Sequence, residues 1–160
     1  GTVGGISATT YPKWKNQFVN VAKDPTASTL LEKMGELYRK CTRGVSAPDI
    51  IVTTHALYAL YESGLTPQQR FSSSKLADAG FEALRFHNAD VIFDENCPAN
   101  RMYFLNTRAI CFNFHRDQMF KVGEKEKQFG QEKYAWPITA MCNFSVRSRR
   151  DLGVLVVATA

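Results

Sequence analysis

The chain has 160 residues, of which 44% are hydrophobic and 22% are charged, and its formal net charge is +5. These values are ordinary for a folded globular protein, and they exclude a disordered tail, a collagen-like repeat and a disulfide-dense miniprotein. A chain of this length buries roughly 70% of its unfolded surface on folding, so one core is expected, in one domain or two lobes.

The first residues predict little regular structure. Residues 1–12 are rich in Gly, Thr and Ser, which favour loop or irregular strand, and residues 14–21 predict an extended segment. The chain opens on Gly with no initiator Met, and we expect it to be a fragment of a longer protein.

The clearest helix is predicted over residues 28–43. Its apolar side chains recur at the helical period, at Leu30, Met34, Leu37, Tyr38 and Cys41. A side-chain oxygen of Ser28 or of Thr26 can cap its first turn, and Glu36 and Lys40 are spaced to pair across one turn.

A strand and a second helix follow in quick succession. The β-branched run at residues 49–53 predicts a buried strand, and Thr54 can cap a helix over residues 55–63. Residues 65–80 are polar and predict a loop.

The rest of the chain predicts strands. Four short ones are expected at residues 82–86, 90–93, 101–105 and 109–114. Residues 123–132 are charged and predict a flexible segment. Residues 134–146 predict one long strand with a free edge or a bulge at Pro137, and residues 153–159 predict the last strand. The fold class is therefore α+β, with a helix packed on a mixed or antiparallel sheet.

The search for a metal or catalytic site yields none. The best metal-ligand cluster comprises His87, Asp90, Asp94, Glu95 and Cys97, which we interpret as a polar turn because strand alternation separates its members. No C-x-x-C pair, G-x-S-x-G motif or phosphate loop is present. Cys111 and His115 would lie ~13 Å apart on one strand, too far to form a nucleophilic pair.

Two patterns favour binding instead of catalysis. Arg147, Arg149 and Arg150 form a basic cluster that could contact phosphates, pair with acidic residues of a neighbouring subunit, or be a solvated connection. Trp14 lies in an aromatic and lysine-rich patch that could stack bases, form a subunit contact or belong to the core; its other members are Tyr11, Phe18, Lys13 and Lys15.

The order of short motifs along nearly the whole chain resembles that of the major capsid proteins of tailed bacteriophages. The motifs are Val3-Gly4-Gly5-Ile6, Trp14-Lys15-Asn16-Gln17, Cys41-Thr42-Arg43-Gly44, Pro48-Asp49-Ile50-Ile51-Val52-Thr53-Thr54, Pro67-Gln68-Gln69-Arg70-Phe71, Ala77-Asp78-Ala79-Gly80-Phe81, Leu84-Arg85-Phe86, Val91-Ile92-Phe93-Asp94, Cys97-Pro98, Met102-Tyr103-Phe104-Leu105-Asn106-Thr107, Cys142-Asn143-Phe144-Ser145-Val146-Arg147 and Leu152-Gly153-Val154-Leu155.

The resemblance implies the tailed-phage major capsid fold, which encapsulins share. Its peripheral domain, with a long spine helix and a long strand, would comprise residues 1–47 and 120–147. Its axial α/β domain would comprise residues 48–119 and 148–160. The N-terminal arm and extended loop typical of such proteins are not recognised in this sequence, and we expect no cross-linking activity.

The resemblance also implies a structural role without enzymatic activity, cofactor or metal. The chain would be a subunit of a phage or prophage icosahedral capsid, self-assembling into hexamers and pentamers around double-stranded DNA in the bacterial host cytoplasm. Its partners would be other copies of itself, with scaffold, portal and decoration proteins as further candidates and no membrane. The alternatives are an encapsulin-like compartment shell, a basic DNA-binding module, or a hydrolase built around His55, His87 or His115.

Overall fold

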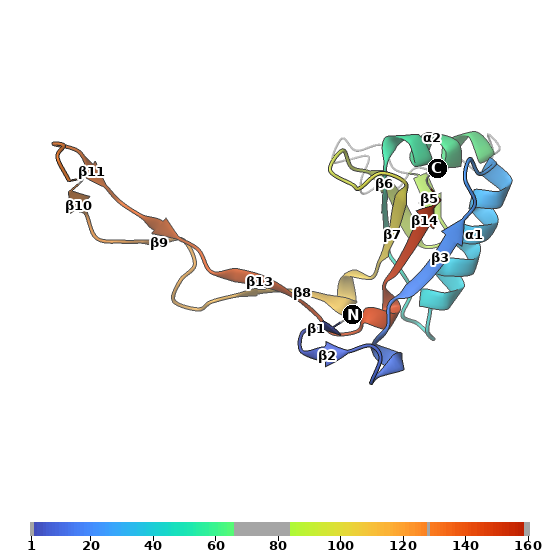
Figure 1. The fold of residues 1–160 in the computed structure, drawn as a ribbon, viewed down its shortest axis with the longest axis horizontal. Helices are drawn as coiled ribbons and strands as arrows, with labels where there is room; N and C mark the ends of the chain where they lie inside the picture. Colours follow the sequence, from blue (N-terminus) through green and yellow to red (C-terminus); the bar gives the residue numbers. More distant parts are fainter. Residues whose placement is uncertain (1, 66–83, 128, 159–160) are drawn as a thin grey trace. The chain divides into compact units, whose positions relative to one another are not determined.

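The computed structural model describes residues 2–65, 84–127 and 129–158 (Figure 1). It divides into two compact units. Unit 1 comprises Gly1–Ala109 with Ser148–Ala160, and unit 2 comprises Ile110–Arg147. The predicted loop at residues 65–80, the first two residues of the predicted strand at 82–86 and the two resemblance motifs at residues 67–71 and 77–81 lie outside the described residues, except for Leu65.

Unit 1 is built on a six-stranded sheet whose strand order is β3-β14-β7-β4-β6-β5. In that order the strands span Gln17–Val21, Gly153–Val157, Arg101–Leu105, Ile50–Thr53, Ala89–Phe93 and Leu84–Phe86. The pairs β3–β14 and β4–β6 are parallel, and the other three pairs are antiparallel. The sheet is therefore mixed, which is one of the two arrangements that the residue pattern left open.

Two helices pack on this sheet. Helix α1 (Ala27–Cys41) lies against β3, β14 and β7, and α2 (His55–Gly64) lies against α1 and β6. Of the two capping residues considered for α1, Thr26 takes the position, because its Oγ1 accepts a hydrogen bond from the Thr29 N–H at 3.4 Å. Among the described residues, no helix is long and apolar enough to cross a membrane.

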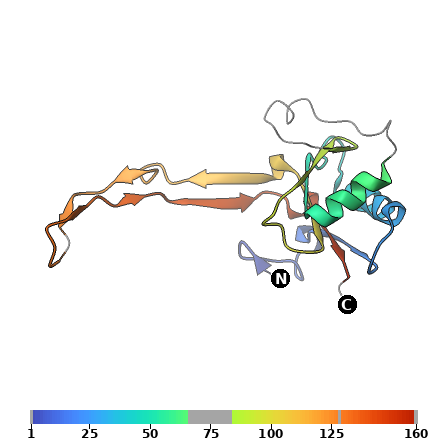
Figure 2. The same ribbon diagram turned by 90° about the horizontal axis from the view of Figure 1, so that it is seen from above.

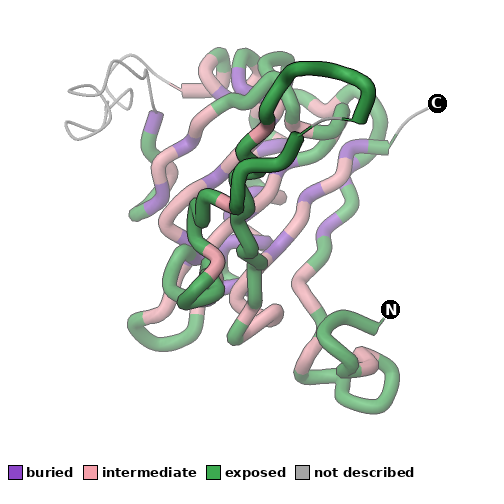
Figure 3. Tube along the Cα trace, turned by 90° about the vertical axis from the view of Figure 1, so that its left-hand side faces the viewer, coloured by how far each residue is buried: buried purple, intermediate pink, exposed green. Residues whose placement is uncertain are grey.

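The core of unit 1 lies between the helices and one face of the sheet. Alternate strand residues are buried, as the changing colours along each strand in Figure 3 show. The buried strand residues belong to the same hydrophobic cluster as the helix residues Leu30, Met34, Leu37 and Cys41. The helical periodicity read from the sequence therefore identifies the face of α1 that is buried.

Gly153 marks the closest approach of β14 to α1. A Cβ atom placed on Gly153 would lie 2.6 Å from Cys41 Sγ and 2.8 Å from Leu37 Cδ1, both inside ordinary contact distance. Only a glycine lets the strand and the helix approach so closely.

The N-terminal segment of unit 1 forms short elements. Strands β1 (Thr2–Val3) and β2 (Ile6–Ser7) pair across Gly4 and Gly5, whose φ angles of 61° and 77° favour glycine. A 3₁₀ turn, η1, follows at Pro12–Trp14. Further along the chain, η3 lies at Thr107–Ala109 and η4 at Arg149–Asp151, just before β14.

Unit 2 is a two-stranded antiparallel ribbon in three paired segments, and its two strands run side by side in Figure 2. The pairs are β8 (Ile110–Phe114) with β13 (Cys142–Val146), β9 (Lys121–Val122) with β12 (Ile138–Thr139), and β10 (Glu126–Lys127) with β11 (Tyr134–Ala135). The long strand expected over residues 134–146 is divided into β11, β12 and β13, and one of its breaks falls at the residue where a free edge or a bulge was expected. Pro137, which has no N–H for a ladder, lies in the break between β11 and β12.

The unit boundaries differ from the domain boundaries that the resemblance implied. The expected division at residues 47 and 48 falls inside unit 1, because α1 packs on β3, β14 and β7 instead of accompanying the ribbon. The expected division near residue 119 falls inside the ribbon. Which unit lies at a capsomer centre and which at its periphery stays a prediction.

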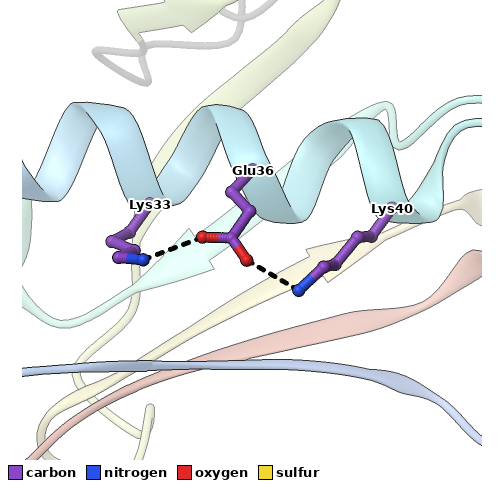
Figure 4. A network of polar contacts seen from close by, with 3 residues as sticks. All are labelled: Lys33, Glu36 and Lys40. Carbon is purple, nitrogen blue, oxygen red and sulfur yellow. Dashed lines mark hydrogen bonds and ion pairs between the residues drawn. The ribbon is translucent and has the colours of Figure 1, made fainter.

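A carboxylate on the exposed side of α1 pairs with two lysines (Figure 4). Glu36 lies 2.9 Å from Lys33 Nζ and 2.7 Å from Lys40 Nζ, which confirms the pairing with Lys40 read from the sequence. The hydrogen bonds from Lys40 and then Lys33 lower the pKa of Glu36 to about 2.

A Glu36→Gln substitution should lower the thermal midpoint slightly at pH 7. The folded pKa lies below the usual 4.5, so the carboxylate contributes stability above pH 4.5 and loses it as the pH falls toward 2. The difference in Tm between the variant and the parent should thus shrink between pH 5 and pH 2, and also in high salt. Calorimetry at several pH values measures it. A difference that is constant with pH would contradict the ion-pair explanation.

Candidate interaction surfaces

The titratable residues considered for chemistry do not converge. No group of three or more His, Cys, Asp or Glu side chains in the described ranges is placed to hold a metal ion. The His87 ring stacks on Tyr38 with 4.8 Å between ring centroids, and His55 packs edge-on against Phe93. Cys111 lies opposite Ser145 in the β8–β13 ladder, and the His115 N–H donates to the Met141 carbonyl just beyond it.

The four cysteines are free thiols, and the structure raises the pKa of two of them. Burial, followed by the nearby Asp151 carboxylate, raises the pKa of Cys41 to about 12. Burial is also the main cause that raises the pKa of Cys97. Because the thiolate is the reactive form, neither sulfur is activated at neutral pH.

The first candidate surface surrounds the junction of η1 and η4, which contact each other although more than 130 residues separate them. Arg149 Nη2 donates to Asn16 Oδ1 at 3.3 Å, and its guanidinium lies 6.0 Å from the centre of the Trp14 ring. Trp14 and Arg149 are both partly buried. They therefore help to hold the junction together, and their role in a subunit or DNA contact stays a prediction.

The junction also contains polar atoms that the fold leaves unpaired. Trp14 Nε1, Arg149 Nη1 and Asp151 Oδ1 are buried and make no hydrogen bond with the described residues. Unpaired buried polar groups are destabilising and uncommon in native proteins. The junction is thus a place in unit 1 where stability alone does not explain the choice of residues.

A pocket of about 490 Å³ opens beside this junction, at the start of β3. We call it the basic pocket, and its lining residues are Pro12, Lys13, Lys15, Asn16, Gln17, Phe18 and Arg150. Of the three arginines that were grouped from the sequence, only Arg150 lines it. Arg147 is exposed and belongs to unit 2.

The second candidate surface is the sheet face of unit 1 that the helices do not cover. Five side chains directly opposite one another form an apolar row across five strands: Phe18, Val154, Tyr103, Val52 and Ile92. Phe18 is 46% exposed, and the other four are only partly buried. We call this set the sheet row. A solvent-facing side of a sheet is usually polar, so an apolar row indicates a surface that contacts another molecule or segment.

The third candidate surface is one face of the ribbon in unit 2. The directly paired residues alternate between an apolar face and a polar face along β8 and β13. The apolar face carries Ile110, Phe112, Phe114, Cys142, Phe144 and Val146, and we call it the ribbon face. Phe112 lies 4.6 Å from Phe144 and 4.3 Å from Phe114 between ring centroids. Phe144 is nevertheless 68% exposed, so this aromatic cluster is formed but not covered.

Sequence reasoning missed the second and third surfaces for different reasons. Alternation of Ile110, Phe112 and Phe114 with Cys111 and Asn113 is a local signal that could have identified the ribbon face. The sheet row depends on the register of five strands that are far apart in the chain, which no local pattern contains.

Two solved structures with a similar fold are an encapsulin complex and a phage capsid. A chain of the holo-SrpI encapsulin complex from Synechococcus elongatus PCC 7942 matches with a TM-score of 0.60 and 14% sequence identity, over 88% of this chain and 52% of that chain. A chain of the cyanophage A-1(L) capsid asymmetric unit matches with a TM-score of 0.63 and 15% identity, over 98% of this chain and 54% of that chain.

These likenesses confirm the predicted fold class and the resemblance on which it rested: the chain has the α+β capsid fold. The chain spans about half the length of both structures. No family model and no curated protein matches the sequence.

Proposed function

We propose that the chain is a structural subunit of a phage or prophage icosahedral capsid, which self-assembles into hexamers and pentamers and encloses double-stranded DNA. The observation that carries the proposal is the pair of uncovered apolar surfaces, the sheet row and the ribbon face, on a capsid fold. Both structural neighbours, an encapsulin complex and a phage capsid, support a role that is structural and not enzymatic.

The ribbon in particular needs a partner. A two-stranded sheet with no layer packed on it is marginally stable in water, and nearly all residues of unit 2 are at least partly exposed. Covering the three phenylalanines of β8 and β13 would remove large apolar surfaces from water. Contact with other copies of the protein is the proposed source of that cover.

Shell assembly explains why such contacts need not be strong individually. A contact worth ~4 kcal/mol gives only millimolar affinity when it acts alone. Many such contacts engaged together in a closed symmetric shell give a stable particle, while misplaced copies can still dissociate. In this proposal the shell is the virion capsid, built in the host cytoplasm, and scaffold, portal and decoration proteins are further partners.

The second candidate is an encapsulin-like compartment shell, which the match to an encapsulin chain favours. Purified particles distinguish the two, since packaged DNA supports the capsid and a protein cargo supports the compartment.

Electron microscopy of the full-length protein expressed in bacteria tests the proposal. We expect closed icosahedral particles or tubular shells of regular diameter, with hexameric and pentameric capsomers. A protein that stays monomeric at every concentration and salt condition, with or without its scaffold, would overturn the proposal.

A further inference from the structure

The basic pocket brings three cations together without a matching set of anions. Lys13 and Lys15 flank Trp14 in and after η1, and Arg150 comes from η4. Neither lysine nor Arg150 takes part in an ion pair with the described residues. The first 23 residues of the chain contain no Asp or Glu, and none of the lining residues is acidic.

The pocket is held in shape by the parts of unit 1 that surround it. The Gln17 N–H donates to the Leu152 carbonyl at 3.0 Å, which joins the start of β3 to the residue before β14. The Arg149–Asn16 hydrogen bond joins the same two segments from their side chains. Lys15 and Arg150 are therefore carried on neighbouring, fixed stretches of backbone, and binding need not order a loop first.

Two further groups in the pocket suit a nucleotide. Asn16 and Gln17 supply amide groups that can donate hydrogen bonds as well as accept them. Phe18 lines the same pocket and is 46% exposed, so its ring is available for stacking. A volume of about 490 Å³ falls in the usual range for sites that take small ligands or single nucleotides.

We infer that the basic pocket binds the phosphodiester backbone of a nucleic acid, with Lys13, Lys15 and Arg150 on the phosphates and Phe18 against an unpaired base. Cations that neutralise phosphates release condensed counterions, which makes such binding salt-dependent. An acidic protein segment would use the same cations but would gain nothing from the aromatic ring. The inference does not depend on shell formation, because every group involved lies in unit 1 of a single copy.

Fluorescence anisotropy with a labelled oligothymidine of about 12 nucleotides, titrated with unassembled protein between about 50 and 200 mM salt, tests this inference. We expect the triple variant Lys13→Gln, Lys15→Gln, Arg150→Gln to bind at least ~10-fold more weakly at the lowest salt. Its salt slope should be shallower by about 0.7 for each phosphate that the protein no longer neutralises. A Phe18→Ala variant should weaken binding of the single strand by ~5-fold or more and leave a duplex of equal length unaffected.

Lys23→Gln is the matched control. Lys23 is an exposed lysine just beyond the other end of β3, and it does not line the basic pocket. It should change the affinity less than ~2-fold. Circular dichroism should show that all variants keep the parent's fold.

Three results would overturn the inference. The first is no binding of either oligonucleotide at low salt. The second is an equal loss of affinity with Lys23→Gln. The third is displacement of the oligonucleotide by polyglutamate at the same charge concentration, which would assign the pocket to an acidic protein segment.

Discussion

A Gly153→Ala substitution should destabilise the protein by about 1–3 kcal/mol, because side chains of α1 already occupy the space that the added methyl group needs. The new Cβ would lie 2.6 Å from Cys41 Sγ and 2.8 Å from Leu37 Cδ1, and both side chains are fully buried in the core. Removing this steric clash requires β14 and α1 to move apart. Such a movement would disturb the sheet, because β14 is a central strand paired on both sides. Chemical denaturation followed by circular dichroism measures the change.

Gly35→Ala is the matched control. Gly35 is buried in the middle of α1, but a Cβ there would meet only the flexible end of Arg39, at 3.2 Å. Alanine is the better helix former by roughly 1 kcal/mol, so this variant should be as stable as the parent or more stable.

A double variant identifies the source of the strain at Gly153. Cys41→Ala removes the sulfur nearest to the new methyl group, so the combination with Gly153→Ala should lose less stability than the two single variants added together. Strict additivity would mean that the sulfur does not limit the approach of β14 to α1. Equal effects of Gly153→Ala and Gly35→Ala would show that the close packing described for β14 is wrong.

The double variant Phe112→Ser, Phe144→Ser should abolish particle formation at the protein concentrations at which the parent assembles. The two rings are directly opposite each other in the β8–β13 ladder and form the centre of the ribbon face. Truncating a central aromatic residue of an interface typically weakens the association by about 2 kcal/mol or more. In a shell the same interface is repeated in every copy, so the weakening per subunit is multiplied across the particle.

The neighbouring residue pair of the same two strands provides a matched control for this variant. Asn113 and Asn143 are directly opposite each other on the polar face of the same ribbon. The variant Asn113→Ser, Asn143→Ser should assemble as the parent does. Analytical ultracentrifugation and negative-stain microscopy distinguish free subunits from particles. Normal assembly of the phenylalanine variant would exclude the ribbon face from the subunit contacts.

Local patterns in the sequence predicted the elements of unit 1 well. The apolar period of α1, the β-branched run of β4 and the helix α2 that follows it were each predicted from neighbouring residues, and the observed bounds differ from the predicted ones by a few residues at most. The resemblance placed α1 in one domain with the ribbon, a division that stays a prediction and differs from the two compact units. The packing of α1 against β3 and β14 depends on contacts between distant parts of the chain.

The candidate surfaces were predictable only in part. Charge and aromatic content drew attention to Trp14 and the three arginines, but the sequence could not distinguish a side chain that faces solvent from one that ties two segments together. Arg149 donates a hydrogen bond to Asn16 and lies over the Trp14 ring, whereas its neighbour Arg150 lines the basic pocket. That difference arises from the meeting of η1 with η4, which only the folded chain defines.

The place of β14 in the sheet determines when unit 1 can mature on the ribosome. Residues 153–157 are inserted between β3 and β7, so the sheet stays divided until β14 has been translated and has left the exit tunnel. Until that moment α1 has no complete surface to pack on, and β3 lacks the strand with which it pairs. The sheet surface of a nascent chain is thus incomplete until β14 has been made, and a product that stops shortly before residue 153 would leave β3 and β7 without the strand that joins them.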